Sequence, residues 1–338
     1  MAGTLSPAKF SHIFEEIQQT KIDPIQVLKN HRLLTESERK RITGADDLAL
    51  EKAINAGAKV IEQKDYPESL QVVDHTPPAL FYRGSLDCLN APCVAIVGTR
   101  RATTYGLAVA QKFSERLAKV GLTIISGGAS GIDTAAHRGA LDVGGKTAAV
   151  MGTGIDKVFP ATNHRLFDEI AQKNGVLVSQ FACGATTEPA FFIQRNELIA
   201  ALADAVLVIE APEKSGALRT AGVAANLNRP VFVVPGSISL ENYRGSHALI
   251  RDGATLVDHP DQVFEAFEIV PDAEEDPETA ELSDVQRQIL EVVSDQPMAA
   301  EKIIAMTGLE TSEVLGELTM MEIDGWLIRD GIGYSRKP

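Results

Sequence analysis

Val94-Ala95-Ile96-Val97-Gly98-Thr99-Arg100-Arg101 has the pattern of a buried strand that runs into a tight turn. Four apolar residues precede the Gly98-Thr99 turn, and an amphipathic helix follows it. A strand that ends in glycine before a helix leaves backbone N–H groups unpaired at the helix start, and such groups suit a phosphate. Arg100 and Arg101 stand beside them, and guanidinium groups match phosphate oxygens. The stretch fits either an anion site or a plain βα turn with two solvated arginines.

The charge of this chain of 338 residues is unevenly distributed. The formal net charge of −14 argues at first against a nucleic-acid partner. From Asp258 to Asp284, however, there are eleven Asp or Glu and no Lys or Arg, whereas Asp65 to Val257 has seventeen acids and seventeen bases. The acidity therefore belongs to one linker and leaves room for a basic groove elsewhere. The length predicts two or three domains, and 44% apolar residues are enough for a sizeable core.

Apolar runs alternate with helical segments from about Ala91 to Val257. Near-continuous apolar strands between helices predict a parallel sheet covered on both faces. Ligands of such sheets bind at the carboxyl ends of the strands. The predicted strands are Val94–Val97, Leu122–Ser126, Ala148–Met151, Val176–Ser179, Ala205–Ile209, Val231–Val234 and Thr255–Val257.

Three further strand ends carry glycine with polar or basic residues, although each glycine alone is equally explained by a left-handed turn. They are residues 126–133 after the second strand, residues 152–154 after the third and Ser215-Gly216 after the fifth. Because the carboxyl ends of parallel strands share one edge, four such ends predict one anion-binding groove. Its candidate residues are Gly98, Thr99, Arg100, Arg101, Ser126, Gly127, Gly128, Gly131, Gly152, Gly154, Lys157, Ser215, Gly216 and Arg219.

Other chemistries have weaker motifs. The mononucleotide P-loop pattern is absent, and the glycine order and ribose-binding acid of a dinucleotide site are missing. A hydrolytic set can be drawn from Ser126, Ser215, Asp133, His137 and Glu210, but no G-x-S-x-G elbow supports a serine nucleophile. His137 stands among apolar helix residues, where a histidine is more often a packing residue than a base.

The segments outside the sheet have other patterns. Residues 1–62 carry apolar residues at helical spacing and predict a small helical region. Residues 76–84, with two prolines, predict an irregular connector that opens the main domain, residues 63–268. Residues 269–281 form an acidic linker, and residues 282–338 predict three helices and a β-hairpin, the pattern of a winged helix.

Cysteine spacing and the chain's apolar runs bear on location and cofactors. Cys88, Cys93 and Cys183 lack paired metal spacing and predict reduced packing thiols of a cytoplasmic protein. The N-terminus has no signal-peptide core, and no run approaches the length of a membrane span. We therefore expect no metal, no cofactor and no membrane partner.

Ordered sequence blocks match one known family from about Tyr66 to Tyr334. They are Gly98-Thr99-Arg100, residues 126–133 with Ala136-His137, Gly152-Thr153-Gly154-Ile155-Asp156, Phe159-Pro160 with Asn163, Phe192 with Arg195-Asn196, Glu210-Ala211 with residues 215–218, and residues 231–236. On these blocks the sequence resembles the DprA (Smf) family, the DNA-processing proteins of bacterial natural transformation.

The resemblance implies an α/β fold, an extended Rossmann-like parallel sheet with the small N-terminal helical region and the C-terminal winged helix. It implies a single-stranded DNA-binding protein that protects incoming strands and loads the RecA recombinase, usually as a homodimer, without cleaving DNA. Arg100 and Lys157, or a neighbour of Lys157, would then hold phosphates. Gly128 and Gly131 would offer backbone N–H groups.

The resemblance also assigns residues outside the strand ends. Arg195 and Asn196 would line or buttress the groove, and Asn163 joins the candidate residues as part of a matching block. The sequence departs from the family at Glu197, which replaces a usual arginine and makes the groove less basic, and at His247 in a turn that usually carries asparagine.

Two rival functions remain. A Rossmann-like enzyme that hydrolyses nucleoside monophosphates would carry P-G-G-x-G-T-x-x-E, but Pro235-Gly236-Ser237-Ile238-Ser239 breaks that pattern. A winged-helix transcriptional regulator would need a basic third helix. The third predicted helix instead carries Glu313, Glu317 and Glu322, so we expect this module not to bind DNA through that helix.

Overall fold

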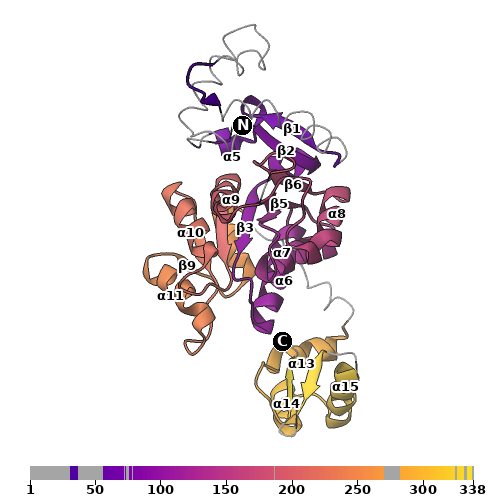
Figure 1. Ribbon diagram of the computed structural model, residues 1–338. Helices are drawn as coiled ribbons and strands as arrows, with labels where there is room; N and C mark the ends of the chain where they lie inside the picture. Colours follow the sequence, from indigo (N-terminus) through magenta and orange to yellow (C-terminus); the bar gives the residue numbers. More distant parts are fainter. Residues whose placement is uncertain are drawn as a thin grey trace. The chain divides into compact units, whose positions relative to one another are not determined.

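The computed structural model describes residues 31–36, 56–71, 73, 76–77, 79–185, 187–269, 282–323, 326–330 and 333–336. The chain divides into two compact units, Met1–Val270 and Pro271–Pro338 (Figure 1). Most of the predicted helical region, residues 1–62, lies outside the described residues, and so does all of the acidic linker, residues 269–281, except residue 269.

The first unit is built on a nine-stranded sheet with the order β1-β2-β6-β5-β4-β3-β7-β8-β9. All neighbouring pairs among β3 to β9 are parallel, as the apolar runs predicted. The strand β2 pairs antiparallel with both of its neighbours, β1 and β6. Each predicted strand is confirmed within one residue at either end. The strands are β1 (Lys59–Glu62), β2 (Ala79–Gly84), β3 (Cys93–Val97), β4 (Thr123–Ser126), β5 (Thr147–Met151), β6 (Val176–Ser179), β7 (Ala205–Val208), β8 (Val231–Val233) and β9 (Thr255–Leu256).

Helices connect the parallel strands, as expected of βα units. None in the described part of the chain is long and apolar enough to cross a membrane. The α-helices of this unit are α5 (Glu68–Gln71), α6 (Thr104–Lys119), α7 (Ile132–Asp142), α8 (His164–Gln172), α9 (Pro189–Leu202), α10 (Gly216–Asn226) and α11 (Arg244–Arg251). The short 3-10 helices are η1 (Gln63–Asp65), η2 (Leu86–Asn90), η3 (Ala161–Asn163), η4 (Glu241–Tyr243) and η5 (Pro260–Phe267).

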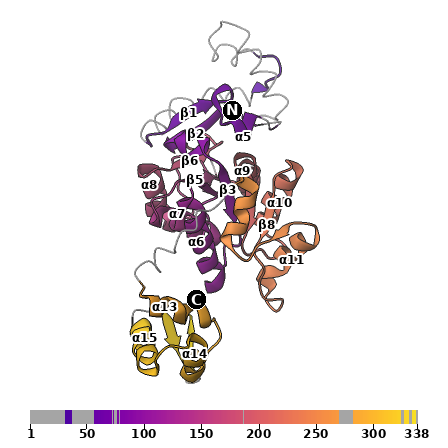
Figure 2. The ribbon, with the colours of Figure 1, turned by 180° about the vertical axis from the view of Figure 1, so that it is seen from behind.

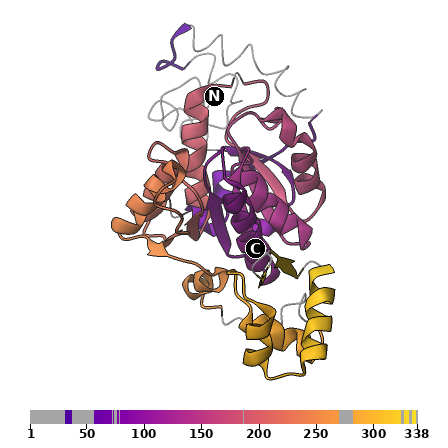
Figure 3. The same cartoon turned by 90° about the horizontal axis from the view of Figure 1, so that it is seen from below.

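Alternate residues of each central strand pack against different helices, so the sheet lies between two helical layers (Figures 2 and 3). In β3, Val94 and Ile96 join the cluster formed with α6, α7 and η5. Ala95 and Val97 join the cluster formed with α9 and α10 on the opposite face. This two-sided burial leaves the carboxyl edge of the sheet as the place where loops meet.

Residues 79–84 form the strand β2 where an irregular connector was predicted over residues 76–84. β2 pairs antiparallel with β6 on one side and with β1 on the other. Leu80 packs into the core of one face, and Phe81 packs against the core of the other. This burial on both faces decides the conformation of residues 79–84, and both prolines precede this strand in the sequence. The strand β1 likewise replaces helical structure at residues 59–62.

The described residues of the second unit form three helices and a hairpin around a core of their own, as a winged helix requires. The elements are α13 (Asp284–Val292), α14 (Ala300–Thr307), α15 (Thr311–Ile323), β10 (Leu327–Arg329) and β11 (Tyr334–Arg336). Ser283 caps α13 by accepting a hydrogen bond from the Gln286 N–H. Residues such as Ile289, Ile303 and Leu318 are fully buried in the core.

Cys88, Cys93 and Cys183 are free and buried, in agreement with a packing role. Burial raises the pKa of Cys183 to about 11 and that of Cys88 to about 12. The thiols therefore stay protonated and are poor nucleophiles.

Candidate anion-binding site

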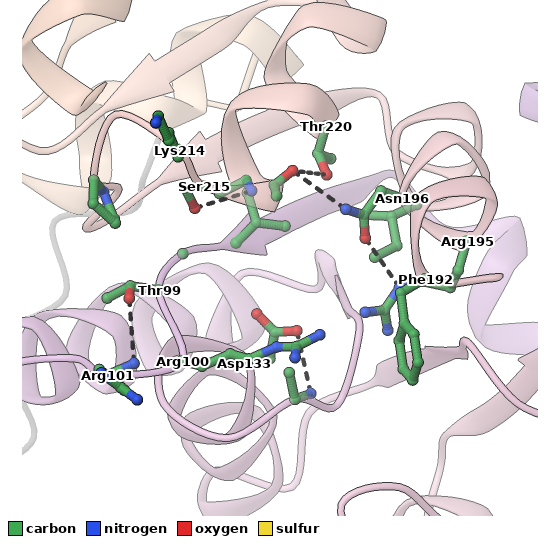
Figure 4. Close-up of a pocket in the computed structure, with 17 residues that line it drawn as sticks. Thr99, Arg100, Arg101, Asp133, Phe192, Arg195, Asn196, Lys214, Ser215 and Thr220 are labelled. Atoms are coloured by element: carbon green, nitrogen blue, oxygen red, sulfur yellow. Dashed lines mark hydrogen bonds between the residues drawn. The ribbon is translucent and has the colours of Figure 1, made fainter. Parts of the chain in front are cut away.

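A pocket of about 360 Å³ lies at the carboxyl edge of the sheet, where β3 borders both β4 and β7 (Figure 4). After β3 the chain first forms β4, β5 and β6 on one side of this strand, and later forms β7, β8 and β9 on its other side. The carboxyl edge beside β3 is therefore a topological switch point, where ligands of open α/β sheets bind. We call this cavity the rim pocket. Eight of the predicted site residues line it: Gly98, Thr99, Arg100, Arg101, Arg195, Asn196, Ser215 and Gly216.

Arg100 is the exposed cation on one wall of the rim pocket. Its guanidinium carbon lies 5.5 Å from the centre of the Phe192 ring, which places the group over an aromatic face. No carboxylate among the described residues forms an ion pair with Arg100. The charge is therefore available to a ligand.

Two buried ionisable residues, Arg195 and Asp133, line the rim pocket. Arg195 is only 4% exposed, and its guanidinium donates to the carbonyl oxygens of Gly127 and, at 2.7 Å, of Val150. Burial lowers the pKa of Arg195 to about 10, although the neighbouring Asp133 carboxyl opposes this shift. Burial in turn raises the pKa of Asp133, and Arg195 opposes that shift. Arg195 thus fastens the ends of β4 and β5, which makes it a buttress of the site.

The loop between β7 and α10 forms the facing wall. Ser215 caps α10, its hydroxyl accepting from the Ala217 N–H at 3.2 Å. Asn196 of α9 donates to the Gly216 carbonyl at 3.2 Å and accepts from Arg195 at 3.1 Å. Lys214 is exposed and lines the same wall. The pocket therefore lies between one arginine-bearing loop and one lysine-bearing loop.

Nine predicted site residues do not line the rim pocket. Ser126 is fully buried and donates to the Ile96 carbonyl at 2.7 Å, and buried Asn163 donates to the Gly128 carbonyl at 3.0 Å. Their polar groups are thus consumed by the protein, and we remove both from the binding set. A side chain on Gly128 or Gly152 would collide with Phe167 or Phe192, so aromatic rings cover these glycines. The other five are Gly127, Gly131, Gly154, Lys157 and Arg219.

For two of these five residues, Gly131 and Arg219, the structure shows why they do not line the rim pocket. Gly131 has φ of +83°, and a side chain there would strike the backbone of Arg100, so this glycine lets α7 begin against the Arg100 loop. Arg219 is paired with Glu197 at 2.8 Å. The glutamate that departs from the family pattern therefore neutralises a predicted cation, as expected for a less basic groove.

Three residues of the alternative hydrolytic set, Ser126, His137 and Glu210, are fully buried and hydrogen-bonded within the protein. The His137 ring is fully buried, with Nδ1 2.7 Å from the Thr147 hydroxyl, which itself donates to the Ile124 carbonyl. Nδ1 must therefore carry the proton, and burial lowers the pKa of this histidine to about 3. Neither Ser126, His137 nor Glu210 lines the rim pocket. The interpretation of His137 as a packing residue is confirmed.

Sequence reasoning missed several residues of the site. Lys214, Asp133 and Phe192 line the rim pocket but were absent from the predicted binding set. A signal for Lys214 was present, because it directly precedes the Ser215-Gly216 turn at the fifth strand end. The position of Phe192 depends on the packing of α9 across the strand ends, which no local pattern reports.

Two family models match most of the chain. The model for DNA recombination-mediator protein A matches residues 44–268, and that for the DprA winged helix domain matches residues 273–331. Among curated relatives, Protein Smf of Synechocystis sp. is 34% identical over 315 residues, covering 82% of this chain and 79% of the relative. Protein Smf of Escherichia coli is 35% identical over 279 residues, covering 80% of this chain and 75% of the relative.

Solved structures agree with these matches. DNA processing protein A (DprA) from Streptococcus pneumoniae superposes with a TM-score of 0.68 at 34% identity, covering 79% of this chain and 95% of that one. DNA processing protein A from Helicobacter pylori, described for its single-stranded DNA binding mode, has a TM-score of 0.57 at 30% identity and covers 62% of this chain and 95% of its own. With this sheet order, this winged helix and these matches, the chain belongs to the DprA/Smf family of DNA-processing proteins.

Proposed function

We propose that this protein binds single-stranded DNA through the rim pocket and does not cleave it. The observation that carries the proposal is the guanidinium of Arg100, which forms no ion pair with the described residues and lines the pocket with Arg101, opposite Lys214. Three exposed cations on two facing loops suit the phosphates of a nucleic-acid strand, and contacts to phosphates do not depend on base sequence. The single-stranded DNA binding described for the Helicobacter pylori relative supports the same assignment.

The cellular role proposed with it is the protection of incoming DNA and its transfer to the RecA recombinase in natural transformation. The family description as a recombination mediator supports this role. Action as a cytoplasmic homodimer belongs to the same proposal. It is tested by adding the protein to single strands coated with single-strand binding protein and measuring the DNA-dependent ATPase of RecA. A RecA rate that does not rise would refute the loading role and leave DNA binding intact.

The rival enzymatic function, nucleoside monophosphate hydrolysis, lacks an arrangement of residues to perform it. The separate hydrolytic set considered from the sequence does not supply one, because its His137 and Ser126 are fully buried and hydrogen-bonded to the protein. The glycine-glutamate motif of that enzyme group is also missing from residues 235–239.

The deciding experiment compares binding and turnover in one sample. Fluorescence anisotropy with labelled oligothymidylate and with a duplex of the same length gives the two affinities across a salt series. The same mixtures are then analysed for shortened DNA, and the protein is incubated with nucleoside monophosphates. Tighter binding of the single strand with no product supports the proposal, whereas base release or preferential duplex binding would refute it.

A further inference from the structure

Glu210 lies just after β7 and is fully buried, yet it does not line the rim pocket. A buried carboxylate is costly unless hydrogen-bond donors surround it. The donors that surround Glu210 come from two separate segments, the loop between β3 and α6 and the 3-10 helix η4. Glu210 therefore connects the end of β7 with the β3–α6 loop and with η4.

The first segment is the loop that carries Arg100 and Arg101. The Thr103 backbone N–H donates to both carboxylate oxygens of Glu210, at 3.2 and 3.1 Å, and the Thr103 hydroxyl donates at 2.9 Å. Thr103 also caps α6, because its hydroxyl accepts from the Gly106 N–H at 3.0 Å. The carboxylate thus lies at the positive end of the α6 dipole.

The backbone of Glu210 holds the other end of the same loop. Its carbonyl oxygen accepts from the Thr99 N–H at 2.7 Å. Arg100 and Arg101 therefore lie between two attachment points, Thr99 and Thr103, both of which bond to one residue.

The second segment, η4, closes the arrangement. The Asn242 side-chain amide donates to the Glu210 carboxylate and also to the Arg101 carbonyl, the latter at 3.0 Å. The Tyr243 hydroxyl donates to the same carboxylate at 3.4 Å. A side chain at Gly106 would collide with the Glu210 carboxylate, so the first turn of α6 packs directly on it.

We propose that Glu210 is the positioning residue of the rim pocket: its buried carboxylate fixes the loop 99–103 and so aims Arg100 and Arg101 at the bound phosphates. This inference rests on the proposed DNA-binding function. Glutamine at this position keeps the size of the side chain, but its amide nitrogen cannot accept. One of the donors from Thr103 or Asn242 then faces another donor, and the loop loses its fixed conformation.

The test is a double-mutant cycle on the full-length protein. Affinity for labelled oligothymidylate is measured for the wild type and Glu210→Gln, and again in a background in which Arg100 and Arg101 are both alanine. We expect Glu210→Gln to weaken binding about tenfold in the wild type, the effect of one lost charge-assisted hydrogen bond. In the background without the two arginines we expect less than about a twofold effect.

The matched control is Glu213→Gln, which removes the same charge from an exposed position in the same β7–α10 loop. Loss of an acid there should leave affinity unchanged or slightly raise it. A second readout, amide hydrogen exchange without DNA, should show faster exchange in residues 99–106 of Glu210→Gln and unchanged exchange in β3 and β4.

Each outcome decides a different statement. Equal weakening in both backgrounds means that Glu210 acts on the fold in general and overturns the positioning role. Weak binding by the arginine variant together with normal binding by Glu210→Gln overturns the positioning role and leaves the DNA site standing. Normal binding by the arginine variant overturns both. Should Glu210→Gln fail to fold, Asn242→Ala replaces it in the cycle, because Asn242 is only half-buried and contacts both Glu210 and Arg101.

Discussion

Replacing Arg100 with alanine should weaken binding of single-stranded DNA and make it less sensitive to salt. Arg100 is exposed, lines the rim pocket and forms no ion pair with the described residues, so no carboxylate in that part of the chain competes with a phosphate for its guanidinium. A cation that contacts one phosphate releases condensed counterions when the complex forms. The variant should therefore lose one phosphate contact from the salt dependence.

The size of the effect follows from the loss of one contact between the protein and a phosphate. For single strands the slope of log K against log salt is about −0.7 per phosphate contact, so the slope of Arg100→Ala should be shallower by about 0.7. Between 50 and 200 mM salt, the ratio of wild-type to variant affinity should then fall by about 2.6-fold. The two binding curves converge as salt increases.

The assay is fluorescence anisotropy with labelled oligothymidylate across that salt range. Lys119→Ala is the matched control, because this exposed lysine ends α6 at the opposite edge of the sheet. The substitution removes one positive charge from the protein, as Arg100→Ala does, but does not change the rim pocket. Parallel slopes for wild type and Arg100→Ala, or the same change of slope in Lys119→Ala, would refute phosphate binding by Arg100.

Three further outcomes are expected. Glu197→Gln should tighten DNA binding in the same assay, because it frees the Arg219 guanidinium now held at 2.8 Å; unchanged affinity would place Arg219 away from the DNA. The pKa of His137 is about 3 in the folded protein, below its ordinary value of about 6.5, so the unfolded chain binds more protons. Stability should therefore fall as pH drops from about 6.5 towards 3, and urea unfolding should show a slope about 1.4 kcal/mol per pH unit smaller in His137→Gln; equal slopes would contradict the buried neutral ring. The separate unit 282–338 should show no measurable DNA binding at physiological salt, since α15 has three glutamates and no base; a measurable affinity would contradict this.

The parallel strands and the position of the site could be predicted from the sequence because both depend on local patterns. A strand buried on both faces needs an unbroken apolar run, and residues 94–97 and 205–208 have one. The carboxyl edge of such a sheet is then fixed by topology, and the turn at Gly98 with its arginines lies there. For the same reason Arg100 and Ser215 were placed correctly in one pocket.

What the sequence could not report is which polar side chains the protein uses for itself. Ser126 and Asn163 carry suitable groups for a phosphate, but both are buried and bonded to backbone carbonyls of the protein. Glu210 was considered only as a member of a hydrolytic set, whereas its hydrogen-bond donors come from residues 107 and 32 positions away in the chain. Hydrogen bonds between such distant segments leave no periodic signal in the sequence.

The antiparallel attachment of β2 to β6 has a practical consequence for anyone shortening this protein. A chain that begins at Cys93, where the first parallel strand β3 starts, would lack both β1 and β2. The backbone N–H and C=O groups of β6 that now bond to β2 would face solvent, and β6, with Leu177 and Val178, would become an exposed apolar edge strand on which other copies could pair. Soluble fragments of the main domain should therefore start ahead of Lys59, because β1 and β2 shield the edge of the parallel strands from pairing with other chains.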